Sequence, residues 1–485
     1  MKLIKEYKLF VQRIGLVGIT NIFIGISSLI LLPIMTKNFS ISNYGIWVQI
    51  NTTIALIPNL ATLGLPYTMV RFLSAEKDKK IIQEGFYSIS TIVLASTTII
   101  SALMFLFSKN IAVAIFNGDV NLAMLLSIIV FLACLNSLLL NFFRTFQQMK
   151  RYSGFLLIQS YLGVLIVSYF AISKYGIFIT ASGLLIANLI TFIIMASFII
   201  LDIGFKLPEF KNFREYLYFG IPTIPSNLSS WIVDSSDRYL IGIFLGTAFV
   251  GYYSPGYTLG YMIIMILAPF SLLLPSLLPK YYEENEIEKV RLYLKYSMKY
   301  FLLIAIPTAF GLSILSKPIL MILTTPEIAL HGYLITPFTA LSALFVGIYA
   351  IILNVIILKK KTKIMGIIWI IAATLNLGLN IIIIPYFGIL GAAATTLLAY
   401  LIAFILTLSY SIKIFKFDFD LPFIFKSVIS SVLMSIIILL IHPEGILNIL
   451  ITIILSSIIY ILFLFIMKGI DKKEIRIIRK IINNN

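Results

Sequence analysis

Apolar runs of about 20 residues, the length that a membrane-spanning helix needs, recur from one end of this chain to the other. Because the hydrocarbon core of a bilayer offers no water to exposed backbone groups, only helices and closed barrels cross it. The composition agrees, since 60% of the residues are hydrophobic and 12% are charged, against about 25% charged in soluble domains. The sequence therefore predicts an all-α polytopic membrane protein.

The apolar runs predict about fourteen transmembrane helices. They lie near residues 13–36, 44–66, 86–108, 121–143, 154–173, 176–201, 220–246, 252–279, 297–316, 333–358, 364–385, 388–412, 427–442 and 446–467. An even number of helices places both ends of the chain on one side of the membrane.

The basic residues indicate which side that is. Only Lys37, Lys109, Lys174 and Lys317 lie in the odd-numbered connections, and Arg238 lies within a helix. Every other Lys and Arg lies at the N-terminus, in an even-numbered connection or in the C-terminal tail. By the positive-inside rule we expect a multi-pass protein of the cell (plasma or inner) membrane with both termini cytoplasmic.

Several functional classes are disfavoured. The net charge of +17 is spread over separate inner segments with no nucleic-acid-binding module, so we expect no nucleic acid partner. One cysteine, Cys134, and two isolated histidines, His331 and His442, form no metal-ligand pattern. No Walker motif is present, so ATP is not expected to drive the protein directly. We expect no enzyme activity, no catalytic residue, no metal and no cofactor; the expected coupling ion, where transport is ion-driven, is H⁺ or Na⁺.

An internal repeat divides the chain. "NYGIWVQ" (Asn43–Gln49) resembles "FVGYYSP" (Phe249–Pro255) at an offset of 206, and three later pairs of segments match in order at offsets of 208 to 212. We therefore predict two six-helix lobes, 1–205 and 206–412, followed by two extra helices and a basic cytoplasmic tail in 413–485. Six helices per copy is an even number, so the copies share one orientation and a pseudo-twofold axis along the membrane normal, with the substrate site between them.

Three charges interrupt the apolar segment "SSWIVDSSDRYLIGIFLG" (Ser229–Gly246). Each costs about 2.5–3.5 kcal/mol at the centre of a membrane helix. At 100° per residue, one helical face gathers five polar side chains. They are Asn227, Ser230, Asp234, Asp237 and Arg238. We call this set the polar stripe; it cannot face lipid.

Two interpretations of the polar stripe remain. Asp234 and Arg238 are four residues apart and can pair, which would leave Asp237 as surplus negative charge. The stripe then either fixes helix packing through an ion pair or forms the wall of a substrate cavity. We favour the cavity wall, because unpaired charge within a membrane is a functional hypothesis by default. Asp234 and Asp237 are also the ion-coupling candidates.

Other polar residues are candidates for the same cavity. The cavity candidates outside the stripe are Asn21, Gln49, Asn376 and Asn380, and Asn21 is the repeat counterpart of Asn227. For each of these residues a plain interhelical hydrogen bond is the alternative interpretation. The further cationic candidates, near the inner ends of helices, are Arg13, Arg71 and Arg144, for which anchoring at the inner leaflet is the alternative.

The chain resembles a known family at this point. The segments that carry the likeness are "ILLPIMTKNFSISNYGIWVQI" (Ile30–Ile50), "SSDRYLIGIFLGTAFVGYYSPGYTLG" (Ser235–Gly260) and the 6+6+2 helix pattern. They resemble the oligosaccharide and polysaccharide flippases of the multidrug/oligosaccharidyl-lipid/polysaccharide exporter superfamily. The resemblance implies two lobes around a central cavity. It also implies transfer of a polyprenyl- or dolichyl-(di)phosphate-linked glycan to the outer leaflet by alternating access.

The resemblance also suggests roles and partners. Arg13, Arg71, Arg144 and Arg238 would contact the phosphate. The expected partners are the lipid-linked oligosaccharide, membrane lipids and glycan-assembly enzymes, and the expected assembly state is a monomer.

Two rival functions stay open. The first is an H⁺- or Na⁺-coupled drug or metabolite antiporter of the same fold, with a flippase for lipid-linked peptidoglycan precursors as a closer variant. The second is a membrane glycosyltransferase or glycan polymerase, suggested by the Asp-x-Asp in "FDFD" (Phe417–Asp420). The second is disfavoured because the motif lies in a short basic loop with no domain around it.

Overall fold

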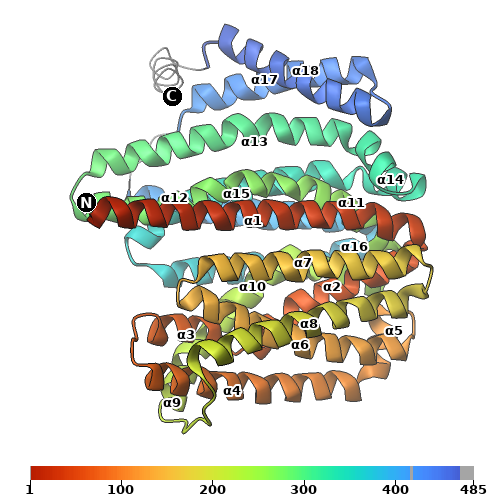
Figure 1. Ribbon diagram of the computed structural model, residues 1–485. Helices are drawn as coiled ribbons and strands as arrows, with labels where there is room; N and C mark the ends of the chain where they lie inside the picture. Colours follow the sequence, from red (N-terminus) through yellow and green to blue (C-terminus); the bar gives the residue numbers. More distant parts are fainter. Residues whose placement is uncertain (1, 416–418, 470–485) are drawn as a thin grey trace. The chain divides into compact units, whose positions relative to one another are not determined.

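The computed structural model describes residues 2–415 and 419–469, and within them all side chains except those of 2–11, 13, 14, 272 and 276. The described residues form helices and short connections, with no strand among them (Figure 1). The α-helices of the first half are α1 (Lys2–Asn38), α2 (Ile41–Ala61), α3 (Leu65–Leu73), α4 (Lys79–Leu106), α5 (Ser108–Ile115), α6 (Val120–Thr145), α7 (Met149–Ile172), α8 (Gly176–Ile203), α9 (Phe213–Gly220) and α10 (Ile224–Leu245). Those of the second half are α11 (Thr247–Tyr261), α12 (Ala268–Glu283), α13 (Ile287–Leu323), α14 (Pro326–Gly332), α15 (Ile335–Leu358), α16 (Thr362–Ile414), α17 (Leu421–Ile441) and α18 (Gly445–Ile466). Two 3₁₀ segments are η1 (Ile221–Thr223) and η2 (Met262–Leu267).

The helices confirm a polytopic membrane fold. Among the described residues, 11 helices are long and apolar enough to cross a membrane, or 12 when α2 and α3, bent by 51° at their break, are one span. Two differences separate this number from fourteen, which stays a prediction. Helix α16 runs through two predicted helices and is interrupted at Gly388, whose φ of 59° and ψ of −146° are not helical. Helix α10 is not among the apolar spans because it carries three charged side chains.

The chain divides into two compact units. The first contains Met1–Ser254 and Leu377–Gly388, and the second contains Pro255–Asn376 and Ile389–Asn485. The first unit therefore extends past residue 205 through α9, α10 and the start of α11. The lobe boundaries expected from the repeat, at 205/206 and 412/413, stay a prediction.

In the first unit, α6 is the central helix. It packs against α2, α4 and α8, and α7 packs against both α8 and α1 (Figure 1). This packing holds a cluster of aromatic rings that includes Phe86, Phe142 and Phe143. Buried Asn136 of α6 donates to the side chain of Asn188 of α8 over 3.0 Å. Hydrogen bonds of this kind join helices that a bilayer alone would not hold together.

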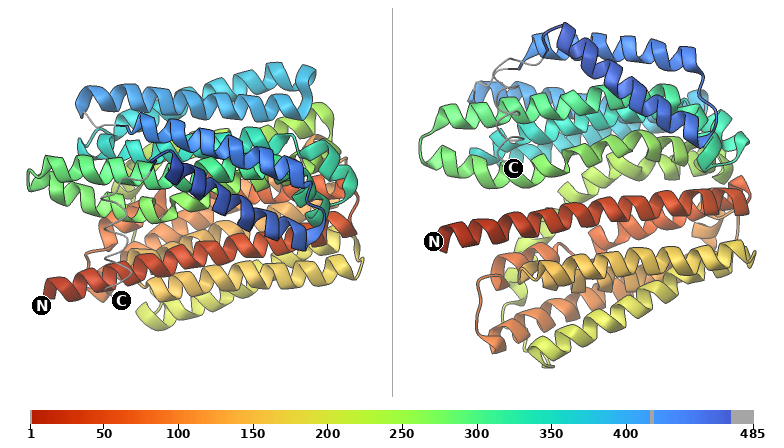
Figure 2. Two further views of the ribbon diagram at one scale, coloured as in Figure 1. Left: turned by 90° about the horizontal axis from the view of Figure 1, so that it is seen from above. Right: turned by 45° about the horizontal axis from the view of Figure 1, so that its top comes forward.

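In the second unit, α13 is the long central helix. It packs against α15, α17 and α18, and α17 and α18 lie side by side (Figure 2). The Tyr460 hydroxyl of α18 donates to the Leu303 carbonyl of α13 over 3.0 Å. Buried Lys299 pairs with Asp420, the residue before α17, over 3.6 Å. Polar links of both kinds therefore attach the two C-terminal helices to α13.

The repeated glycines lie where α2 crosses α11. A Cβ on Gly45 would come within 1.8 Å of the Thr247 carbonyl oxygen, and one on Gly251 within 2.5 Å of the Ile41 carbonyl oxygen. The two contacts are reciprocal, because Ile41 and Thr247 are separated by the same offset as Gly45 and Gly251. A local twofold relation between two copies has this property, since each copy then presents the same surface to the other. The crossing thus agrees with the internal repeat.

Candidate functional site

Helix α10 carries the polar stripe. It follows the 3₁₀ segment η1 and begins with Pro225 in its first turn, which suits proline because that backbone N–H has no helical partner. It ends at Gly246, whose φ of 97° lets the chain turn directly into α11. The stripe residues Asn227, Ser230 and Asp234 are half-buried.

Asp237 is the most deeply buried residue of the stripe. Its carboxylate is completely buried. Its Oδ1 accepts from the Arg238 backbone N–H over 2.7 Å and lies 3.4 Å from Arg238 Nη1, while its Oδ2 accepts from the Tyr253 hydroxyl. A buried carboxylate is tolerated when it is paired and hydrogen-bonded in this way.

The pairing differs from the one expected from spacing alone. The Arg238 guanidinium forms an ion pair with Asp237, and its Nη1 also donates to the backbone carbonyl of Asp234 over 2.8 Å. The prediction that Asp237 is the surplus charge is therefore wrong. The reason is that Arg238 folds back along the helix axis, which brings its Nη1 to Oδ1 of the preceding residue as well as to the carbonyl one turn earlier.

Helix α2 packs against the side of α10 next to this network. Fully buried Gln49 donates through Nε2 to the Arg238 carbonyl over 2.7 Å. Thr53, one turn later on α2, shares a hydrogen bond with the Tyr239 hydroxyl. Gln49 fits here because Gly242 has no side chain. A Cβ at that position would lie 2.4 Å from Gln49 Nε2. Gln49, a predicted cavity residue, thus holds the backbone of α10.

The remaining candidates lie on helices other than α2 and α10. The side chains of Asn21, Arg71 and Arg144 are exposed, on α1, α3 and the end of α6. Asn376 and Asn380 are fully buried on α16, and Asn376 donates to Thr396 over 3.5 Å. The Arg13 side chain lies outside the described residues.

Tyr253 and Tyr67 are the site residues that the sequence reasoning missed. Tyr253 is fully buried on α11, and the Tyr67 hydroxyl on α3 donates to Asn227 Oδ1 over 3.3 Å. From the sequence alone, a tyrosine in an apolar helix is most simply interpreted as a packing residue. The signal that could have identified Tyr253 is that a buried charge in the preceding helix needs a hydrogen-bond donor. The sharp turn at Gly246 brings α11 back alongside α10 and so places such a donor within reach.

Tyr253→Phe tests the support of Asp237. Removing the hydroxyl takes one donor from a buried carboxylate, and a hydrogen bond to a charged group contributes about 1.5–3 kcal/mol. We expect the free energy of unfolding to fall by about that amount, measured by thermal or denaturant unfolding in detergent. Tyr175→Phe, at an exposed tyrosine, is the matched control and should leave stability unchanged. Equal stability of Tyr253→Phe and wild type would contradict the described hydrogen bond.

No metal centre is present in the part of the chain that the structure describes. There, no three His, Cys, Asp or Glu side chains gather closely enough to hold an ion. In "FDFD", Asp420 accepts from the Phe423 backbone N–H over 3.1 Å and so caps α17, while Asp418 lies outside the described residues. The Asp420 carboxylate therefore has a structural role as the N-cap of α17.

Comparisons with known proteins agree with the fold. A relative from Haloferax volcanii, named "Probable low-salt glycan biosynthesis flippase Agl15", is 24% identical over 230 residues, which are 47% of this chain and 48% of that protein. The chain thus spans about half the length of this relative. The lipid II flippase MurJ in an inward closed conformation has the same fold, with a TM-score of 0.76, 20% identity and coverage of 92% of this chain and 97% of that one. An inward-facing multidrug resistance MATE family transporter also shares the fold, with a TM-score of 0.65 and 15% identity. That match covers 81% of this chain and 97% of the transporter.

Two family models match the sequence. The model described as MatE matches residues 222–382. The model described as polysaccharide biosynthesis protein matches residues 10–278, which is more than half of the chain and includes α10 with its polar stripe. This multi-pass membrane protein therefore belongs to the polysaccharide biosynthesis protein family.

Proposed function

We propose that the protein is a flippase that moves a polyprenyl- or dolichyl-(di)phosphate-linked oligosaccharide from the cytoplasmic to the outer leaflet by alternating access. The glycan would serve the assembly of a cell-surface polysaccharide or glycan. Family membership, the likeness to a glycan biosynthesis flippase and the fold shared with a lipid II flippase support this proposal. No chemical step is part of it, so the protein acts as a transporter and needs no cofactor.

The buried ion pair of α10 is the observation that carries the proposal. A phosphate that crosses an apolar layer needs a fixed cation, and arginine binds phosphate through two parallel N–H donors. Arg238 keeps 12% of its side chain exposed while Asp237 holds it from the buried side. We assign phosphate contact to Arg238 and a positioning role to Asp237, which is too deeply buried to meet a sugar.

The other candidates take supporting roles. Asn227, Ser230 and Asp234 are half-buried beside Arg238 and suit sugar hydroxyls, and Asp234 remains the ion-coupling candidate. Asn21, Asn376 and Asn380 remain cavity candidates. Arg13, Arg71 and Arg144 remain phosphate candidates at the cytoplasmic entrance. With both termini cytoplasmic, the protein would work as a monomer beside glycan-assembly enzymes, driven by an H⁺ or Na⁺ gradient or by consumption of the product outside.

An ion-coupled antiporter is the second candidate. The match to the MatE model and the fold shared with a MATE transporter favour it. It is less favoured because the polysaccharide biosynthesis model covers more of the chain, and because Asp237 already neutralises Arg238 and so is poorly placed to bind a transported cation. A glycosyltransferase is disfavoured further, since Asp420 is engaged with Lys299 and with the start of α17.

Translocation in proteoliposomes tests the proposal. A fluorescent polyprenyl-diphosphate oligosaccharide is placed in both leaflets, and a membrane-impermeant reductant bleaches the label outside. Vesicles without protein should keep about half of the fluorescence, while vesicles with the protein should lose nearly all of it as inner lipid moves outward. A label attached to a phospholipid serves as the control for non-specific scrambling. Persistence of half of the signal with several lipid-linked glycans would contradict the proposal.

A further inference from the structure

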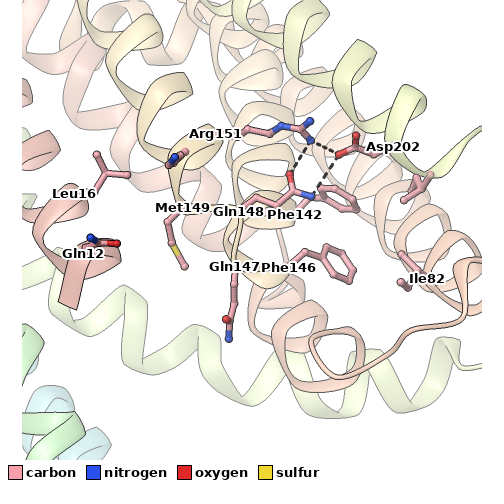
Figure 3. A pocket seen from close by; sticks show the side chains of 12 residues that line it. Gln12, Leu16, Ile82, Phe142, Phe146, Gln147, Gln148, Met149, Arg151 and Asp202 are labelled. Atoms are coloured by element: carbon pink, nitrogen blue, oxygen red, sulfur yellow. Dashed lines mark hydrogen bonds and ion pairs between the residues drawn. The ribbon is translucent and has the colours of Figure 1, made fainter. Parts of the chain in front are cut away.

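A polar pocket opens in the first unit, at the ends of five helices. It has a volume of about 760 Å³ and lies between α1, α4, α6, α7 and α8 (Figure 3). Its polar lining consists of Gln12, Gln147, Gln148, Lys150, Arg151 and Asp202. No residue of the polar stripe lines it. The pocket is therefore separate from the site described above.

A three-residue network forms one wall. Figure 3 shows Arg151, Gln148 and Asp202 pointing toward one another. Arg151 Nη1 donates to Gln148 Oε1 over 3.0 Å and pairs with Asp202 Oδ2, and Gln148 Nε2 lies 3.4 Å from the same oxygen. The network joins the start of α7 to the end of α8 and fixes the orientation of the guanidinium. The Gln148 side chain makes no capping hydrogen bond to α7.

The network leaves binding capacity in the pocket. Within the described residues, Arg151 uses only Nη1 for protein oxygens, and Asp202 Oδ1 has no partner. The exposed side chain of Lys150, also in the lining, forms no ion pair there. The pocket thus offers two cationic donors next to one free carboxylate oxygen. That set suits a phosphate with a hydrogen-bond donor beside it.

The expected position of the pocket in the membrane restricts the class of ligand that it can bind. Lys150 and Arg151 belong to an even-numbered connection, which is cytoplasmic in the predicted orientation. Basic pockets between membrane helices on that side bind lipid headgroups. Leu16, Ile82 and Phe146 add an apolar lining that accommodates the glycerol backbone of a lipid better than a hydrated sugar.

We propose that this pocket binds the headgroup of an inner-leaflet phospholipid, one that carries a phosphate and a neighbouring donor. Phosphatidylethanolamine and phosphatidylglycerol fit this description. The phosphate contacts Lys150 and the unused donors of Arg151, and the ammonium or glycerol hydroxyl donates to Asp202 Oδ1. Bound lipid would hold the inner ends of α7 and α8 together. The inference rests on the predicted orientation and is independent of the transported substrate.

Native mass spectrometry of the detergent-solubilised full chain tests this site. Phosphatidylethanolamine, phosphatidylglycerol and phosphatidylcholine with identical acyl chains are added in turn, and each dissociation constant is measured. Phosphatidylcholine has a phosphate but no donor. We expect it to bind about tenfold more weakly than the other two, since a charge-assisted hydrogen bond is lost.

Three variants separate the contributions. Lys150→Gln and Arg151→Gln should each weaken phosphatidylglycerol binding about tenfold, whereas Asp202→Asn, which removes the charged acceptor, should bring the affinities for phosphatidylethanolamine and phosphatidylglycerol close to that for phosphatidylcholine. Lys363→Gln, at another exposed lysine, is the matched control and should change nothing. Since the exposed Lys150 side chain forms no ion pair within the described residues, its variant stays informative where Arg151→Gln folds poorly.

Two results would overturn the proposal. Equal affinity for all three lipids, unchanged in the Lys150 and Arg151 variants, would show that the pocket has no headgroup site. Displacement of phosphatidylglycerol from wild type by an equimolar polyprenyl-diphosphate oligosaccharide, with no such displacement in Lys150→Gln, would assign the pocket to the transported lipid.

Discussion

Arg238→Ala is expected to lower the rate of glycan-lipid translocation by more than tenfold. The substitution removes the cation assigned to the phosphate, and a charged hydrogen bond contributes about 1.5–3 kcal/mol, or about tenfold and more. It also removes the cationic partner of buried Asp237, and breaking a buried ion pair destabilises a protein by about 3–5 kcal/mol. Translocation is measured in proteoliposomes at equal amounts of correctly folded protein.

Three further variants separate transport from folding. Arg238→Lys keeps a positive charge but loses the planar fork, so we expect partial transport. Asp237→Asn keeps the volume and removes the anchor of Arg238, so transport should fall less than in Arg238→Ala. Lys109→Gln, at an exposed lysine outside the network, should transport like wild type. Wild-type rates in folded Arg238→Ala would return the polar stripe to a packing role.

Gly45→Ala is expected to give the largest loss of stability among single methyl additions in this chain. The new Cβ would lie 1.8 Å from a backbone carbonyl oxygen of Thr247, which no side-chain rotation can relieve. Overpacking of this kind costs about 1–3 kcal/mol and occasionally more. We expect a loss of at least about 3 kcal/mol, since the contact is with backbone, and a lower yield of folded protein.

Gly154→Ala is the matched control. Gly154 also lies within a helix, but a Cβ there meets nothing within 4 Å. Since alanine favours helix by about 0.8–1.0 kcal/mol over glycine, this variant should be neutral or slightly more stable. Thermal unfolding in the same detergent measures both variants. Equal stability of the two variants would contradict the close crossing of α2 and α11.

The polar stripe was predictable because a helix has a fixed period. The spacing of Asn227, Ser230, Asp234, Asp237 and Arg238 alone places these residues on one face. The choice of partner was not predictable. Spacing suggests that Arg238 pairs with Asp234. The observed pair with Asp237 depends instead on the direction of the Arg238 side chain and on the hydroxyl that Tyr253 of α11 donates to Asp237.

Contacts between helices account for most of what the sequence left open. Tyr253 meets Asp237 only because Gly246 turns the chain, and no pattern within α10 carries that information. The repeat singled out Gly45 and Gly251 as equivalent, but not the reciprocal contacts that make both positions intolerant of a side chain. Apolar runs similarly located most spans, and the interruption at Gly388 lies at the expected boundary between 364–385 and 388–412.

A side-by-side transport measurement tests the central claim most directly. Wild-type protein is reconstituted into one batch of vesicles, and transbilayer movement of a polyprenyl-diphosphate oligosaccharide is followed alongside efflux of a cationic dye under an imposed H⁺ or Na⁺ gradient. The account predicts rapid movement of the lipid-linked glycan and no gradient-driven dye efflux. Dye efflux that follows the ion gradient, with the glycan lipid confined to its original leaflet, would contradict it and establish the antiporter.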